Sequence, residues 1–136
     1  MKLHRGRLID HVHLRVSDLE ASKRFYRAVL ASLGVPDALV EGDGFFFADE
    51  LFVDQADGSV SKVHLAFQAP DRDVVRAFHR AGVSAGGRDN GAPGERPYHP
   101  GYYAAFVLDP DGNNIEAVFH GPSTRSAPSV VVTAAG

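Results

Sequence analysis

Three side chains with metal-binding chemistry, His11, His64 and Glu116, stand at related places in the sequence. Each histidine lies in a stretch where polar and apolar residues alternate, as in a strand, and the glutamate follows a tight-turn sequence at residues 109–112. Two neutral imidazoles and one carboxylate on one side of a divalent ion leave coordination positions open for water or substrate. The sequence therefore predicts a catalytic metal site at these three residues, provided that the fold brings them together.

The first half of the chain predicts the elements that would position His11. Residues 8–16 alternate as a strand, and apolar residues recur at helical spacing over residues 19–30. Short apolar runs separated by turn residues then predict three more strands, at residue 40, residues 45–47 and residues 51–53. This half is therefore predicted to have the element order βαβββ.

The second half repeats the first at an offset of 53 residues, from position 11 to position 64. The offset superposes a strand residue, a helix N-cap, a helix core residue and a helix C-cap without a gap: His11 on His64, Asp18 on Asp71, Phe25 on Phe78 and Gly34 on Gly87. Two such modules related by a pseudo-twofold axis would place their first strands at equivalent positions. We therefore expect His11 and His64 to face each other.

These signals predict an α+β fold in which two tandem βαβββ modules, at about residues 8–56 and 61–120, form one cupped mixed sheet. A single domain is expected over residues 1–120. The tail, residues 121–136, shows neither helical nor clear strand periodicity. We expect it to lie outside the fold and to be partly disordered.

Composition excludes several classes of function. The 136-residue chain has a formal net charge of −3 and no basic stripe, so neither nucleic acid nor a membrane surface is an expected partner. The N-terminus has no apolar leader segment, and no later segment approaches the roughly 18 apolar residues of a membrane span, which predicts a cytoplasmic protein. Because cysteine is absent, any metal must be held by nitrogen and oxygen, and Fe, Mn, Co, Ni and Zn all remain open.

Other chemistry-bearing side chains share faces with the predicted ligands. Alternation places His13 beside His11, where its imidazole is a candidate general base or hydrogen-bond partner; packing near the site is the alternative role. On the penultimate strand, Tyr102 and Phe106 are expected to line the cup, with Tyr102 as the second candidate catalytic residue. The segment 86–101, rich in Gly and Pro, is predicted to be a loop long enough to close over a ligand.

Three segments carry a family resemblance: residues 11–26, which include the start of the first predicted helix, residues 63–67, and residues 109–116. Over residues 8–120 the sequence resembles the vicinal oxygen chelate superfamily. This superfamily includes glyoxalase I, extradiol dioxygenases, fosfomycin-resistance thiol transferases and metal-free bleomycin-binding proteins, all built on paired βαβββ modules and often dimeric. The resemblance implies metal ligands at His11, His64 and Glu116, a small-molecule substrate and a homodimer.

Similarity to the glyoxalase branch bears mainly on the first module. Bacterial glyoxalase I enzymes carry a fourth ligand where this chain has Phe52, which is instead expected to line the substrate site. Glu50 and Asp54 share the strand parity of Phe52, so either remains a candidate for a fourth ligand. Arg15 matches a glyoxalase arginine that binds a substrate carboxylate, and a surface role at the strand end is its alternative.

The other branches match less completely. Extradiol dioxygenases share the two-His, one-Glu set but have a catalytic tyrosine where this chain has Phe106. Tyr102 and His99 are out of register with that tyrosine but remain candidates to replace it. Fosfomycin enzymes have a threonine where it has His13. We therefore expect a divalent-metal-dependent enzyme, a glyoxalase-like lyase or a ring-cleaving dioxygenase, whose small substrate chelates the metal through oxygen. The alternative is a metal-free small-molecule binding or resistance protein of the bleomycin-binding type.

Overall fold

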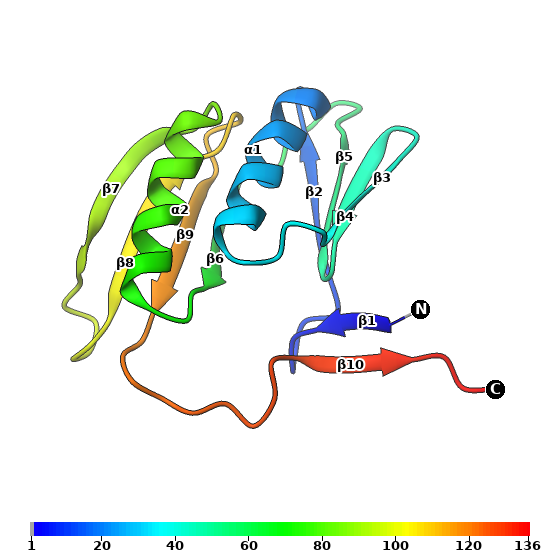
Figure 1. Ribbon diagram of the computed structural model, residues 1–136. Helices are drawn as coiled ribbons and strands as arrows, with labels where there is room; N and C mark the ends of the chain where they lie inside the picture. The colour runs from blue at the N-terminus through cyan, green and yellow to red at the C-terminus, as the bar shows by residue number, and fades with distance from the viewer. Residues whose placement is uncertain (1) are drawn as a thin grey trace.

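Residues 2–136 are described by the computed structural model, which over that range contains two α-helices, two four-stranded sheets and a separate two-stranded ribbon (Figure 1). The first module comprises β2 (Val12–Val16), α1 (Leu19–Ser32), β3 (Leu39–Gly42), β4 (Phe45–Ala48) and β5 (Leu51–Gln55). The second comprises β6 (His64–Gln68), α2 (Arg72–Ser84), β7 (Arg88–Glu95), β8 (Tyr103–Leu108) and β9 (Asn114–Phe119). The predicted α+β class and the two βαβββ modules are confirmed.

The two sheets have the same topology. The strand order is β2-β5-β4-β3 in the first sheet and β6-β9-β8-β7 in the second. The first strand of each module runs parallel to the last strand, and the other pairs are antiparallel. β2 and β6 are therefore edge strands, each with one side that is unpaired within its sheet.

Both helices begin at the predicted caps. Asp18 accepts a hydrogen bond from the backbone N of Ala21 at 3.1 Å, and Asp71 accepts one from Val74 at 2.8 Å. Each carboxylate satisfies a backbone N–H that the first helical turn leaves without a partner. Within the described residues, neither helix is both long enough and apolar enough to cross a membrane.

The two modules meet through their helices. A Cβ added at Gly87 would lie 2.6 Å from both Phe25 of α1 and Val107 of β8, and Gly82 of α2 faces the same two side chains. Phe25 and Val107 thus fill the space that the two glycines leave open, and Figure 1 shows α1 beside α2. The left-handed residue after α2 is Gly86, at φ 101°, so the predicted cap at Gly87 was one residue late. Close packing against Phe25 and Val107, rather than a left-handed backbone, explains the glycine at position 87.

One hydrophobic core lies between the helices and the sheets. Its buried residues come from both modules and include Leu14, Phe25, Tyr26, Phe46 and Val53 from the first and Val75, Phe78, Val107, Ile115 and Ala117 from the second. Because strand side chains alternate between the two faces of a sheet, the opposite face of each sheet points away from this core. We call these the outward faces, and they carry the predicted site residues.

The predicted loop after α2 was wrong over part of its length. Arg88–Glu95 form the strand β7, which pairs with β8. Register shifts between Asp89 and Gly91 and between Gly91 and Gly94 interrupt the pairing. Bulges, glycines and Pro93 are tolerated because β7 is an edge strand, and they give the segment the composition of a loop.

The tail also contains a strand that the sequence did not predict. β10 (Val130–Thr133) pairs antiparallel with β1 (Lys2–Arg5), and Figure 1 shows this ribbon below the first sheet. His4 Nδ1 lies 2.7 Å from Ser129 Oγ, which ties the two ends together. All four residues of β10 are exposed, so no alternation of apolar and polar residues marks the strand. The partial disorder expected for the tail remains a prediction.

Candidate functional site

Two of the three predicted ligands meet on the outward face of the second sheet. His64 opens β6, and Glu116 lies in the middle of its parallel neighbour β9, where the register pairs it with Ala66. His64 Nε2 lies 2.8 Å from Glu116 Oε1. The side chain of Glu116 is 3% exposed and that of His64 is 54% exposed. A solvent-accessible imidazole therefore stands over a nearly buried carboxylate.

Tyr102 holds the second oxygen of that carboxylate. The residue precedes β8, and its hydroxyl donates a hydrogen bond to Glu116 Oε2. Burial, the hydrogen bond to Glu116 and the negative charge of Glu116 raise the pKa of Tyr102 to about 12. The phenol therefore keeps its proton at neutral pH and acts as a donor. Both oxygens of Glu116 are engaged, as a buried carboxylate requires.

Phe106 lies beside this pair, on the face where it was predicted. The β8–β9 register places it directly opposite Glu116, and its ring centroid is 6.0 Å from that of His64. Arg96, which follows β7, holds its guanidinium carbon 5.2 Å from the centroid of the Phe106 ring. Its positive charge opposes the rise in the pKa of Tyr102. Arg96 belongs to the segment 86–101, which the sequence predicted to close over a ligand, but its contact with Phe106 was not predicted.

Two further histidines that were not predicted as site residues flank Tyr102. His99 Nε2 lies 2.9 Å from His120 Nδ1, and the two rings stack with centroids 5.1 Å apart. Both also pack edge-on against the Tyr102 ring, at 5.3 and 5.1 Å. His120 shares the strand parity of Glu116, so alternation along β9 was a signal that could have identified it. His99, which lies beyond the irregular strand β7, was considered only as an out-of-register replacement for a catalytic tyrosine and as part of the loop predicted to close over a ligand.

The outward face of the first sheet carries the other predicted polar residues. His11 directly precedes β2; its Nδ1 lies 2.7 Å from Asp10 Oδ1, and its side chain is 60% exposed. His13 Nε2 is 2.9 Å from Asp54 Oδ1, and Arg15 Nε is 3.5 Å from the same oxygen. One carboxylate oxygen of Asp54 thus contacts both the imidazole of His13 and the guanidinium of Arg15.

Phe52 occupies in the first sheet the place that Glu116 occupies in the second. β5 pairs Phe52 with His13, and β9 pairs Glu116 with Ala66, the residue 53 positions after His13. The first module therefore has a phenyl ring at the place of the second module's carboxylate. Of the two candidates for a fourth ligand, Asp54 is engaged with His13.

Glu50, the other candidate for a fourth ligand, directly precedes β5. Its backbone carbonyl accepts a hydrogen bond from Val12 N at 2.7 Å, which aligns it with the start of β2. Its carboxylate lies near Gly6, since a Cβ built on that glycine would be 3.8 Å from Glu50 Oε2. Glu50 thus lies beside the start of β2, one residue before the pair Leu51 and Val12.

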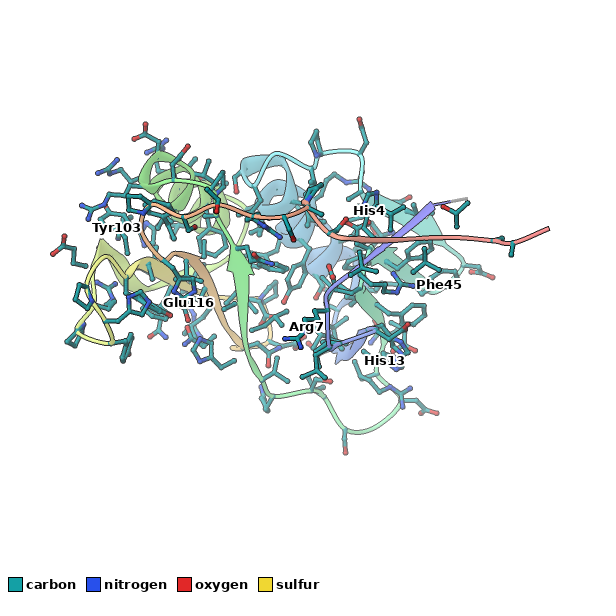
Figure 2. The ribbon with its side chains drawn as sticks, turned by 90° about the horizontal axis from the view of Figure 1, so that it is seen from below. His4, Arg7, His13, Phe45, Tyr103 and Glu116 are labelled. Carbon is teal, nitrogen blue, oxygen red and sulfur yellow. The ribbon has the colours of Figure 1, made fainter. Side chains whose placement is uncertain are left out.

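The structure does not bring His11 to His64 and Glu116. Within residues 2–136 there is no group of three or more His, Asp or Glu side chains placed to hold a metal ion together. Figure 2 shows Glu116 on the second sheet and His13 on the first, well apart, with β6 between them. The cause is the contact between α1 and α2, which joins the modules through their helices and leaves β2 and β6 as separate edges.

The His64 and Glu116 side chains fit a divalent cation. An imidazole nitrogen and a carboxylate oxygen lie 2.8 Å apart, and both are donor types that first-row divalent metals accept. The Tyr102 hydroxyl fixes the carboxylate in the manner of the outer-shell partners that orient metal ligands. The fit is incomplete within one chain, because the third predicted donor, His11, lies elsewhere.

The comparisons with known proteins agree on one family. The family model for the glyoxalase-like domain matches residues 11–118. A glyoxalase/bleomycin resistance protein from Albidiferax ferrireducens T118 is 33% identical, with a TM-score of 0.67, over 82% of this chain and 97% of that one. A glyoxalase-related enzyme from Fulvimarina pelagi is 22% identical, with a TM-score of 0.71, over 95% of this chain and 99% of that one. No protein of curated function matches the sequence.

A lactoylglutathione lyase from Agrobacterium tumefaciens is also similar in fold, at 23% identity and a TM-score of 0.56, over 83% of this chain and 93% of that one. Identities this low support a shared fold and no more. The family match, by contrast, runs from the residue before β2 almost to the end of β9 and so covers both modules. The chain therefore belongs to the glyoxalase-like domain family, within the vicinal oxygen chelate superfamily.

Proposed function

We propose that this protein is a divalent-metal-dependent enzyme that acts on a small substrate with adjacent oxygens, as a glyoxalase-like lyase or a ring-cleaving dioxygenase. The observation that carries the proposal is the nearly buried Glu116, with His64 2.8 Å from one carboxylate oxygen and Tyr102 donating to the other. An oriented carboxylate facing an accessible imidazole is the form that a metal ligand pair and its outer-shell partner take.

The site is completed, in this proposal, by a second copy of the chain. The outward face of the first sheet of one copy would lie opposite the outward face of the second sheet of the other, bringing His11 of one copy to His64 and Glu116 of its partner. The exposure of His11 and His64 supports this arrangement, since each side chain contacts one carboxylate of its own chain and is still more than half exposed. The places of β2 and β6 at the ends of their sheets support it as well, because an edge strand is a place where another chain can add.

The residues around the site have separate tasks in this chemistry. A bound divalent cation supplies Lewis acidity toward adjacent substrate oxygens. Tyr102 orients Glu116 by donating a hydrogen bond to its carboxylate. The hydroxyl keeps its proton at neutral pH, because its pKa is about 12. His13, with its ring oriented by Asp54, stands two residues from His11 and can take up or return a proton. Arg15 shares Asp54 and presents a cation to a substrate carboxylate.

Metal content tests the proposal directly. The protein is purified without chelator or affinity metal, and bound metal per chain is compared by elemental analysis with His64→Ala and with the control His79→Ala. His79 is a matched control because it also pairs with a carboxylate, Asp89, at 2.8 Å, but lies on α2 outside the site. We expect the wild type and the control to retain metal and His64→Ala to lose it.

The identity of the retained metal then selects the assay. Iron or manganese directs the assay to catechols under oxygen, whereas nickel or zinc directs it to the hemithioacetal of glutathione and methylglyoxal. A wild-type protein that holds no metal after loading with each ion in turn would contradict the enzyme proposal and support the metal-free binding protein.

A further inference from the structure

Three phenylalanines form a row of nearly parallel rings on the outward face of the first sheet. The ring of Phe45 stacks on Phe52 with centroids 5.3 Å apart and an interplanar angle of 17°. It also stacks on Phe47, at 6.5 Å and 14°. All three rings are partly exposed, although each follows or precedes a residue that is buried in the core. We call Phe45, Phe47 and Phe52 the phenylalanine wall.

The strand register arranges the wall beside the polar group of the same face. One row across the sheet runs from His13 through Phe52 to Phe47, and the next runs from Arg15 through Asp54 to Phe45. The His13 ring meets the Phe52 ring edge-on, with centroids 5.0 Å apart. The wall therefore ends at an imidazole and a guanidinium rather than at more apolar surface.

The fold itself does not require these rings. The second sheet has the same topology, and its equivalent positions are occupied mainly by small or polar residues. The equivalent rows there run from Ala66 through Glu116 to Phe106 and from Gln68 through Val118 to Ala104. Partly exposed aromatic rings on only one of two equivalent faces indicate a binding surface for a ligand or another protein.

We propose that the phenylalanine wall is the binding site for an aromatic ring of the substrate, which makes the substrate class aryl compounds that carry adjacent oxygens on a short side chain. Near-parallel phenyl rings offer both stacking and edge contacts to one more planar ring at the centroid separations that aromatic pairs prefer. Arg15, at the end of the wall, pairs with Asp54 through Nε and is 45% exposed, and its guanidinium has further N–H donors that match an anionic or oxygen-bearing substituent. The choice of an oxygen-bearing head group rests on the proposed function. The binding site for the aromatic ring is inferred from the phenylalanine wall alone.

The test uses two probes that share one head group. Phenylglyoxylate and cyclohexylglyoxylate carry the same adjacent oxygens but differ in whether the ring is aromatic. Their dissociation constants are measured by titration calorimetry with the full-length protein, both as purified and after removal of metal by chelation. We expect phenylglyoxylate to bind about fivefold more tightly than cyclohexylglyoxylate in both states, the order of preference that one aromatic pair provides.

Variants test whether the phenylalanine wall causes the preference for phenylglyoxylate. Phe52→Leu and Phe45→Leu are expected to reduce the ratio of the two dissociation constants to about one, because each removes a stacked ring but keeps an apolar side chain. Phe67→Leu, on the core-facing side of β6, removes a phenyl ring elsewhere and should leave the ratio unchanged. Thermal unfolding of each variant reports whether it is folded.

Three results would overturn the inference: equal binding of the two probes by the wild type, an unchanged ratio in both wall variants, or variants that weaken self-association while leaving the ratio as in the wild type. The last result would show that a second copy of the chain, not a ligand ring, covers the wall. A protein that holds no metal but still prefers the aryl probe would contradict the proposed function and leave this inference standing.

Discussion

At the scale of single residues, Glu116 is held from two sides. Its carboxylate is almost excluded from solvent, with one oxygen facing His64 and the other accepting a hydrogen bond from Tyr102. A buried carboxylate is costly unless its oxygens are engaged, and His64 and Tyr102 engage one oxygen of Glu116 each. The ability of this site to bind a cation should therefore depend on the phenol as well as on the ligands.

Replacing Tyr102 by phenylalanine tests that dependence. The change removes the donor to Glu116 Oε2 and keeps the ring, so we expect metal affinity to fall by about tenfold while the fold is retained. Competition with a chelating dye measures the affinity. Tyr98→Phe is the matched control, since Tyr98 is 68% exposed and its ring packs against that of Tyr102. Equal affinities in the two variants would show that the phenol does not support the ligand.

A second buried tyrosine stabilises the fold rather than the site. The Tyr26 hydroxyl donates to Asp109 Oδ2 at 2.6 Å, and both residues are buried. Tyr26→Phe would leave that carboxylate with one partner fewer, which should lower the free energy of unfolding by about 1–3 kcal/mol. Urea denaturation near neutral pH measures the change, with the exposed Tyr98→Phe as control. A loss no larger than in the control would contradict this role.

The same pair predicts a pH dependence. Burial, followed by the charge and hydrogen bond of Asp109, raises the pKa of Tyr26 well above its ordinary value of about 10. The folded protein therefore holds this proton more tightly than the unfolded chain does. The stabilisation is complete below about pH 10 and is lost as pH rises further, by about 1.4 kcal/mol per pH unit. The stability difference between wild type and Tyr26→Phe should narrow above pH 10, whereas parallel profiles would contradict the assignment.

At the scale of elements, the contact of α1 with the second module depends on Gly87. A Cβ there would lie 2.6 Å from Phe25 and Val107 and 2.7 Å from the backbone oxygen of Gly82, which cannot move aside. Gly87→Ala should therefore destabilise the protein by about 1–3 kcal/mol through overpacking. Gly6→Ala is the control, because its new methyl group would meet only ordinary contacts at 3.7 Å or more. Equal unfolding midpoints for the two variants would show that the packing can relax.

The elements that the sequence predicted well are those with a local chemical signal. Asp18 and Asp71 each mark a helix start, because a side-chain cap acts within three residues of its own position. β7 was missed since its bulges and Pro93 give an edge strand the composition of a loop. β10 was missed since its only sheet partner is β1, at the other end of the chain, and its residues do not alternate in burial.

At the scale of the whole molecule, the repeat predicted two equal modules but not how they join. Alternation predicted that His11, His13 and Arg15 share one face, which in the structure lies opposite the core, and the structure places His64 with Glu116 on the equivalent face of the second sheet. Whether those two faces meet depends on the packing of α1 against α2, which no periodicity records. The site therefore remains divided within one chain, and the proposed dimer accounts for this division.

Mixing two defective chains tests the shared metal site most directly. His11→Ala and Glu116→Gln each damage the site from a different module, and the two variants are refolded together and separately before bound metal per chain is measured. If each site takes His11 from one copy and Glu116 from the other, a mixed dimer contains one intact site. Random pairing then restores about a quarter of the wild-type metal content. A mixture that binds no more metal than the average of the two variants alone would contradict the shared site.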